Sequence, residues 1–161
     1  MRIFATTPVD VPAEHAWALV ADEFGNNAKW VSSLSSSRLN RDTVEAGTGR
    51  VCQLGKQELV EEITDLDRDH LVLTYKMPNP PGPVRTVTNT WTVTPKGASR
   101  CDVSSDVNLS LRWWGKPVAP LMKLSLNRVI ARALEEFRHY AETGTPHPRK
   151  VEQQRKLSSA R

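Results

Sequence analysis

One long alternation of apolar and polar residues, followed by a switch to a helical pattern, constrains this chain most. For nearly 80 residues up to Trp113 the period is close to two, and the alternation is clearest from Cys101 onward. Such a pattern is typical of antiparallel strands with one buried and one solvated face. From Pro117 to Ala141 the apolar residues recur at helical spacing. We expect a helix of about 37 Å, which is long enough to cross the sheet and cover its apolar face.

The first thirty residues predict one strand and two short helices. Arg2–Val9 suits a strand, and Pro12 then stands in the first turn of a helix. Residues 25–27, with the sequence GNN, are expected to break the chain. A second short helix around Ala28–Val31 then brings Trp30 inward.

This order of elements predicts an α+β domain. A curved antiparallel sheet of about six to seven strands would wrap around the long C-terminal helix, with the two short helices after the first strand. One helix cannot fill the concave side of a strongly twisted sheet, so we expect an internal cavity. Four tryptophans fall on the inferred interior faces and provide either core packing or an aromatic wall for a ligand: Trp17, Trp30, Trp91 and Trp113. Trp114 is out of phase and is expected at the surface.

The charge distribution divides the chain in two. Residues 1–144 contain 17 Lys and Arg against 17 Asp and Glu, whereas residues 145–161 contain five basic residues and only Glu152 as an acid. A body without net charge argues against nucleic-acid binding. We therefore expect a single domain at residues 1–144 and a basic, disordered tail at residues 145–161.

Several site classes lack support in the sequence. No run of about 18 apolar residues is present to span a membrane, and the first residues lack the pattern of a signal peptide, so we expect a cytoplasmic protein without stable membrane insertion. Cys52 and Cys101 have no metal-binding or redox spacing and are interpreted as small buried hydrophobes. Neither a metal nor a cofactor is expected.

The stretch GRVCQLGKQELVEEI, residues 49–63, predicts a β-hairpin. If Gly55-Lys56 forms a two-residue type II′ turn, Arg50 lies directly opposite Glu61, on the face that carries Cys52 and Leu59. Burying a lone charge on an apolar face would cost several kcal/mol, but two opposite charges that face each other offset much of this cost. Two interpretations stay open: an ion pair that fixes the strand register, or the polar end of a cavity that binds a carboxylate, hydroxyl or keto oxygen.

Other residues on the same inferred interior extend this candidate site. Tyr75 and Asn89 would share the polar role if they line the same space, although core packing is the simpler interpretation of each. The full set of candidate ligand-binding residues is Trp30, Arg50, Glu61, Tyr75, Asn89, Trp91, Trp113, Met122, Ser125 and Val129.

Several segments in one order are characteristic together: VDVPAEHAWALVAD with Trp30 soon after, GTGRVCQLG, LVEEITDLD followed by LVLTYKM, TVTNTWTV, and the closing helix. In these segments the chain resembles the SRPBCC or START-related superfamily with the helix-grip fold, and within it the polyketide cyclase/dehydrase and lipid-transport branch. The resemblance covers about residues 2 to 143. The resemblance implies a cavity for a hydrophobic ligand, such as a lipid, a polyketide or another aromatic molecule, and it leaves the activity open.

Three functions therefore remain open. The first is a binding or transport protein for a small hydrophobic molecule, monomeric or homodimeric, without nucleic acid. The second is a cofactor-independent polyketide cyclase or dehydratase, with Glu61 as base, Arg50 polarising a carbonyl oxygen and Tyr75 as acid. Because an adjacent arginine stabilises the charged carboxylate and weakens it as a base, we rank binding above catalysis. The third is a regulatory or toxin-like interaction protein.

Overall fold

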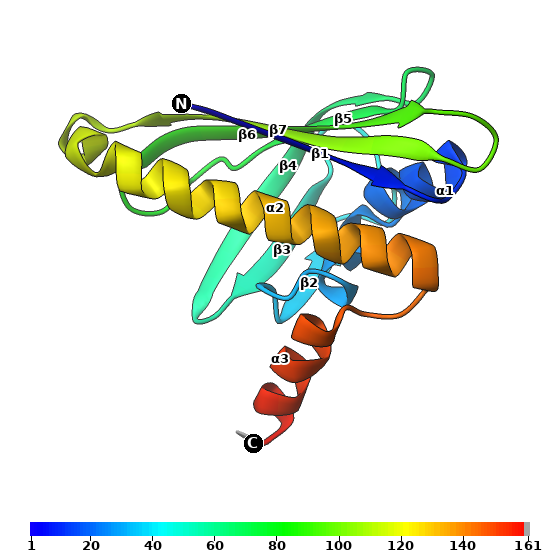
Figure 1. The fold of residues 1–161 in the computed structure, drawn as a ribbon. Coiled ribbons are helices and arrows are strands. Elements are labelled where there is room, and N and C mark those ends of the chain that lie inside the picture. Colours follow the sequence, from blue (N-terminus) through cyan, green and yellow to red (C-terminus); the bar gives the residue numbers. More distant parts are fainter. Residues whose placement is uncertain (160–161) are drawn as a thin grey trace.

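The fold is a seven-stranded antiparallel sheet with one long helix across its concave face (Figure 1). The structure is a computed structural model and describes residues 1–159. The strands lie in the order β1-β7-β6-β5-β4-β3-β2, and every neighbouring pair is antiparallel. Their bounds are β1 Arg2–Val9, β2 Ser36–Leu39, β3 Gly49–Leu54, β4 Gln57–Asp67, β5 Val72–Lys76, β6 Val84–Pro95 and β7 Cys101–Leu111. The expected α+β class with a curved sheet and a C-terminal helix is confirmed.

The long helix begins later than the sequence indicates. Helix α2 spans Ala119–Thr143, and the preceding segment, with Pro117 inside it, forms the 3-10 helix η3, Trp113–Val118. Gly144 ends α2 in the left-handed conformation with φ of 71°, which a glycine adopts without steric cost. The C-terminal half of α2 enters the core through Leu134, Phe137 and Ala141.

Three short helical segments connect β1 to β2 and close one end of the sheet. They are α1, Ala13–Trp17, then the π-helix η1, Ala18–Asp22, and the 3-10 helix η2, Phe24–Lys29. The prediction of a break at residues 25–27 is wrong, because these residues lie inside η2. Gly25 allows this tight path, since a Cβ atom there would lie 2.6 Å from the Leu39 side chain. Trp30 follows η2 and is buried, as expected.

The C-terminal segment differs from the expected disordered tail. Residues Pro148–Ser159 form helix α3, which lies below the sheet in Figure 1. Pro148 occupies the first helical position, and the His147 ring nitrogen Nδ1 accepts a hydrogen bond from the Arg149 backbone amide at 3.2 Å. The Lys150 side chain is 1% exposed and donates to the Leu34 carbonyl oxygen at 2.6 Å. The tail therefore docks through long polar side chains and not through an apolar stripe.

Most of the core lies between the concave face of the sheet, the short helices and the second half of α2. A smaller cluster around Ile3, Val107 and Leu109 packs under the first half of α2. Both cysteines are free and buried, as expected. Within residues 1–159, no helix is long and apolar enough to cross a membrane.

Candidate functional site

A cavity of about 410 Å³ lies between the sheet, α2 and the short helices. Its volume falls within the roughly 300–1,000 Å³ that is usual for small-molecule sites. Its walls are mainly apolar, and the exposed side chains of Ser33, Leu54 and Val129 mark its mouth. The lining residues are Leu19, Val20, Asn27, Trp30, Val31, Ser33, Leu34, Arg50, Leu54, Leu59, Glu61, Leu73, Tyr75, Met77, Val87, Asn89, Trp91, Val107, Leu126, Val129, Ile130 and Ala133.

The β3–β4 hairpin brings the two charged residues into this cavity. Its register pairs Arg50 with Glu61, Cys52 with Leu59 and Leu54 with Gln57, as the turn chemistry predicts. Gly55 has a φ of 58°, which fits the first central position of a type II′ turn. Because side chains alternate across a strand, this register directs both members of the ion pair to the concave face.

Arg50 is held from several sides. Its Nε donates to Glu61 Oε2 at 2.5 Å, and its Nη1 donates to the Phe24 carbonyl oxygen at 3.0 Å. The guanidinium carbon lies 4.1 Å from the centre of the Phe24 ring and 4.9 Å from that of Tyr75, as expected for cation–π contacts. Burial alone would lower the pKa of Arg50, but Glu61 and the neighbouring Tyr75 and Cys52 groups together raise it. Arg50 therefore stays charged inside the protein.

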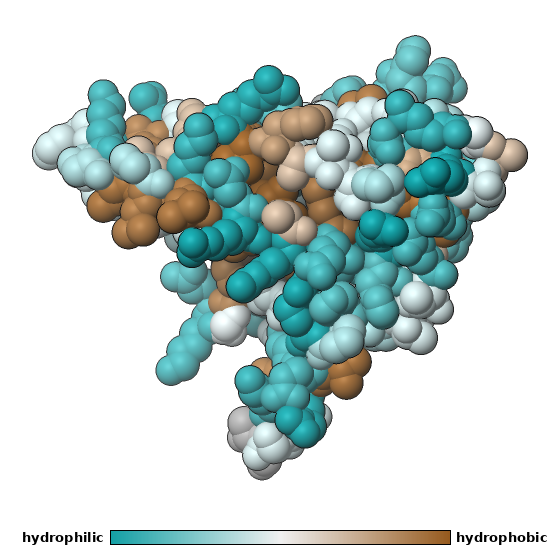
Figure 2. Space-filling model, viewed as in Figure 1, coloured by the Kyte–Doolittle hydropathy of each residue, from teal (hydrophilic) through white to brown (hydrophobic). Residues whose placement is uncertain are grey.

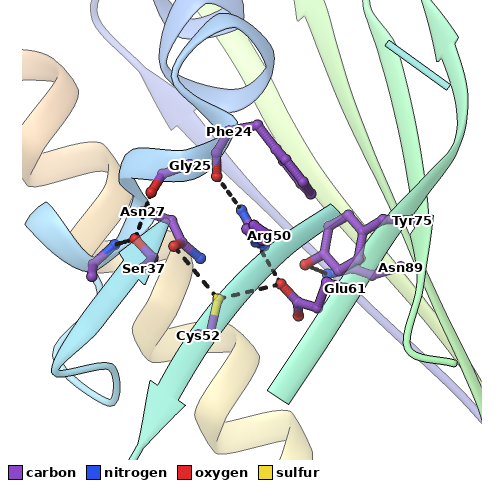
Figure 3. A network of polar contacts seen from close by, with 10 residues as sticks. Phe24, Gly25, Asn27, Ser37, Arg50, Cys52, Glu61, Tyr75 and Asn89 are labelled. Atoms are coloured by element: carbon purple, nitrogen blue, oxygen red, sulfur yellow. Dashed lines mark hydrogen bonds and ion pairs between the residues drawn. The ribbon is translucent and has the colours of Figure 1, made fainter. Parts of the chain in front are cut away.

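The ion pair leaves polar atoms free. Figure 3 shows that both contacts to Glu61, from Arg50 and from the Cys52 thiol at 3.8 Å, meet at the same oxygen, Oε2. Within residues 1–159, neither Glu61 Oε1 nor Arg50 Nη2 has a hydrogen-bond partner. Yet no fully buried side-chain nitrogen or oxygen in these residues lacks a partner. Both atoms therefore border accessible space, and the cavity is the space that both residues line.

A chain of hydrogen bonds across three strands orients Tyr75. Ser105 on β7 donates to Asn89 Oδ1 at 2.8 Å, and Asn89 Nδ2 on β6 donates to the Tyr75 hydroxyl oxygen at 2.9 Å. Asn89 is thereby fixed in one orientation. Since the tyrosine oxygen accepts in this bond, its own hydrogen stays available for a ligand in the cavity.

The two weakly acidic groups beside the ion pair are neutral near pH 7. Burial, together with the Glu61 charge, raises the pKa of Tyr75 to about 12. Burial is also the main cause that raises the pKa of the Cys52 thiol to about 11. The cavity thus offers one cation, one anion and the neutral Tyr75 hydroxyl, whereas the Cys52 thiol lies behind the ion pair and does not line the cavity.

Aromatic rings form another part of the cavity wall. Trp30, Trp91 and Phe137 pack with ring centres 5.3–6.1 Å apart in edge-on or tilted arrangements. Both tryptophans line the cavity, whereas Phe137 supports them from α2 and is fully buried. The apolar part of a ligand in the cavity could pack against this wall.

The structure brings together seven of the ten candidate residues. The cavity is lined by Trp30, Arg50, Glu61, Tyr75, Asn89, Trp91 and Val129. Trp113 is a correction: strand β7 ends at Leu111, and the Trp113 side chain is 81% exposed on η3. Met122 packs against the smaller core cluster, and Ser125 is exposed, so neither lines the cavity.

Two groups of lining residues outside the strands were not among the candidates from the sequence. On α2 these are Leu126, Ile130 and Ala133, which share a helix face with the expected Val129. The other group comes from irregular segments, with Leu19 and Val20 on the π-helix and residues 31–34 in a loop. Periodicity identifies a helix face to within about one residue and carries no signal for a loop.

Comparisons with known proteins agree with this geometry. The family model described as polyketide cyclase / dehydrase and lipid transport matches residues 1–142. No curated protein matches the chain. A solution NMR structure from Thermobifida fusca is 24% identical, with a TM-score of 0.67, and the match covers 91% of this chain and 97% of that one.

Two aromatase/cyclases also share the fold. The di-domain ARO/CYC BexL has a TM-score of 0.75 at 15% identity, over 86% of this chain and 45% of that chain. The Zhui aromatase/cyclase from Streptomyces has a TM-score of 0.69 at 17% identity, over 88% of this chain and 93% of that one. At such identities the likeness establishes a common fold.

Proposed function

Because the chain belongs to the polyketide cyclase/dehydrase and lipid-transport family, we propose that its cavity binds one small, mostly apolar molecule with a hydroxyl or keto oxygen. The observation that carries this proposal is the set of free polar atoms in an apolar cavity. Arg50 Nη2 and the Tyr75 hydroxyl offer hydrogens, and Glu61 Oε1 accepts one. A hydroxyl that bridges Arg50 and Glu61 uses its donor and its acceptor at once.

The charge balance of the site favours a neutral ligand. Arg50 and Glu61 neutralise one another at a contact of 2.5 Å, and both side chains are largely buried. A ligand carboxylate would add a third charge without a free counter-ion, and a buried unpaired charge is strongly disfavoured. Of the three oxygen groups considered from the sequence, hydroxyl and keto groups therefore fit better than a carboxylate.

A second candidate function, cyclisation or dehydration in the same cavity, is supported by the free proton on Tyr75 and the free oxygen on Glu61. Glu61 Oε1 would remove a proton from the carbon next to a carbonyl. The double bond would form as the neighbouring carbon–oxygen bond breaks, and Tyr75 would protonate the departing hydroxyl so that water leaves. The same free oxygen and free proton are also accounted for by hydrogen bonds to a bound ligand, without any bond being broken. Binding therefore stays our first proposal.

Native mass spectrometry of freshly purified protein, followed by organic extraction, tests the binding proposal. We expect a bound neutral molecule, or a thermal shift with members of a panel of fatty alcohols, fatty acids and aromatic polyketides, with the neutral members binding more tightly. No bound molecule together with no shift across the panel would contradict the proposal. Turnover of an aromatic polyketide, followed by chromatography, would favour the enzyme instead.

A matched pair of variants tests the site. Glu61→Gln keeps an acceptor for Arg50 but removes the charge, and we expect about a tenfold loss of affinity for a hydroxyl-bearing ligand. Glu62→Gln is the control, because Glu62 points to the outer face and pairs with Lys76. Circular dichroism verifies that both variants fold. Equal affinities in the two variants would place the ligand elsewhere.

A further inference from the structure

The end of the molecule formed by η3 and the first turns of α2 exposes apolar side chains that the proposed ligand site does not use. Trp113 is 81% exposed and Leu121 is 72% exposed, and about half of each of Trp114, Val118 and Leu124 is exposed. We call these five residues the end patch. Figure 2 shows brown surface gathered over the first turns of α2, at the tip of the molecule. Exposed apolar residues clustered in this way mark an interaction surface.

The end patch is held outward by backbone contacts. The Arg112 amide donates to the Pro83 carbonyl oxygen at 2.8 Å, and the Arg112 side chain donates to the carbonyl oxygens of Gly82 and Val84. Gly115 packs so closely that a Cβ atom there would lie 2.5 Å from the Pro83 side chain. These contacts fix η3 against the β5–β6 loop, so Trp113 projects into solvent in a fixed structure.

Basic residues alternate with the end patch along the chain, without acidic ones between them. Residues 107–134 contain five basic side chains and no Asp or Glu: Arg112, Lys116, Lys123, Arg128 and Arg132. Within residues 1–159, Lys116, Lys123 and Arg128 form no ion pair, in contrast to most basic residues of the sheet. An arrangement of tryptophan and leucine between unpaired cations suits the interface of an anionic bilayer, where the rings enter the headgroup region and the cations meet phosphates.

We propose that the end patch docks this protein reversibly on anionic membranes. A protruding tip has no hollow to receive a partner's side chains, whereas a fluid lipid surface accepts inserted rings and aliphatic chains. Docking there also brings the cavity close to the lipid, because Leu126 and Val129 at the cavity follow Leu121 by about 8–12 Å along α2. The end patch shares no residue with the proposed ligand contacts, so the membrane proposal and the ligand-binding proposal can be tested independently of each other.

Vesicle co-sedimentation of the full chain tests the proposal. One set of vesicles contains phosphatidylcholine alone, and the other contains phosphatidylcholine and phosphatidylglycerol in equal parts. We expect binding to the anionic set only, weakened by salt. Tryptophan emission should shift to the blue on binding, because Trp113 and Trp114 are exposed whereas the other three tryptophans are buried.

Matched variants separate the two contributions. Lys116→Glu with Lys123→Glu should lower the partition onto anionic vesicles by more than about tenfold, and Trp113→Ser with Leu121→Ser by at least about tenfold. The control, Lys156→Glu with Leu157→Ser, alters one exposed cation and one exposed apolar residue on α3 and should bind as the native chain does. Since every altered side chain is exposed, all three variants should keep the native melting temperature.

Three outcomes would overturn the proposal. The first is an absence of binding to the anionic vesicles, and the second is equal binding by the end-patch variants and the control. The third is patch-dependent association with something other than lipid while the vesicles stay unbound. Sedimentation velocity would reveal such a contact between two copies of the chain, and retention on an immobilised acidic protein would reveal a protein partner.

Discussion

Two carboxylates, the half-buried Glu61 and the fully buried Glu136, contact arginine in different ways within one fold. Glu136 on α2 is 1% exposed, and both of its oxygens are engaged: Oε2 by the Ser32 amide, and Oε1 by the Ser32 hydroxyl and Arg149 Nε. Among the residues that the structure describes, Glu61 is contacted only at Oε2, and its Oε1 borders the cavity. A fully engaged carboxylate thus connects structural elements, whereas a partly engaged one beside a cavity keeps one acceptor oxygen without a protein partner.

The largest effect is expected from breaking the cavity pair. Glu61→Leu leaves the buried Arg50 guanidinium without its counter-ion. This variant should therefore lower the free energy of unfolding by about 3–5 kcal/mol in chemical denaturation. Adding Arg50→Met should restore most of that stability, because two apolar side chains need no partner. The stable double variant should still lose ligand affinity. Native ligand affinity in this variant would mean that the pair only fixes the strand register.

A smaller loss is expected at the other carboxylate. Glu136→Ala leaves the Ser32 amide without an acceptor, while Arg149, whose side chain is 34% exposed, regains water. We expect a loss of about 2–3 kcal/mol in the free energy of unfolding. The control is Glu135→Ala, whose exposed carboxylate should contribute less than about 1 kcal/mol. Equal losses of unfolding free energy in Glu135→Ala and Glu136→Ala would show that the burial of Glu136 does not make it more important for stability than Glu135.

Removal of residues 145–161 tests how much stability α3 contributes through its contacts with Glu136 and Leu34. The truncation deletes Arg149 and Lys150 but keeps Ser32 as a partner for Glu136. The truncation should therefore lower the free energy of unfolding by about 2 kcal/mol, which is less than the loss expected for Glu136→Ala. The measurement is a lower melting temperature. Arg155→Ala is the control, because the one ion pair that Arg155 forms within residues 1–159 lies inside α3 and is exposed. An unchanged melting temperature in the truncated chain would show that α3 does not stabilise the domain.

The smallest effect concerns the thiol beside the cavity pair. Burial raises the pKa of Cys52 from 9.0 to about 11, so the protonated thiol is favoured in the folded chain. Its contribution to stability is complete below pH 9.0 and is lost as the pH rises toward about 11. Over this range the free energy of unfolding of the native chain should fall by about 1–2 kcal/mol more than that of Cys52→Ala. Parallel pH curves for the two proteins would contradict the prediction.

The fold and the centre of the site could be predicted because both rest on strand periodicity. A glycine turn of known length and strict alternation together determine which residues face each other, and they correctly placed Arg50 opposite Glu61. Trp91 followed from the same strand alternation, whereas Trp30 followed from the short helix expected just before it, and both line the cavity. These features depend on short-range geometry, which the sequence determines directly.

The predictions were wrong for two segments whose positions depend on contacts with residues far away in the sequence. Trp113 continues the alternation in sequence, but the chain leaves the sheet after Leu111 and binds the β5–β6 loop instead. The docking of α3 depends on Arg149 and Lys150, which in a polar segment look like solvated charges. Neither contact has a local signal, because each partner lies far away along the chain.

The contact between Lys150 and the Leu34 carbonyl oxygen also imposes an order on biosynthesis. The two residues are 116 positions apart, and the ribosome adds roughly 5–20 residues each second. The rim of the cavity is therefore translated several seconds before the side chain that anchors it. A nascent chain can therefore form its sheet and the contacts of Ser32 with Glu136 before the Leu34 carbonyl oxygen receives its hydrogen bond from Lys150. The last helix to be made adds that final contact beside the entrance.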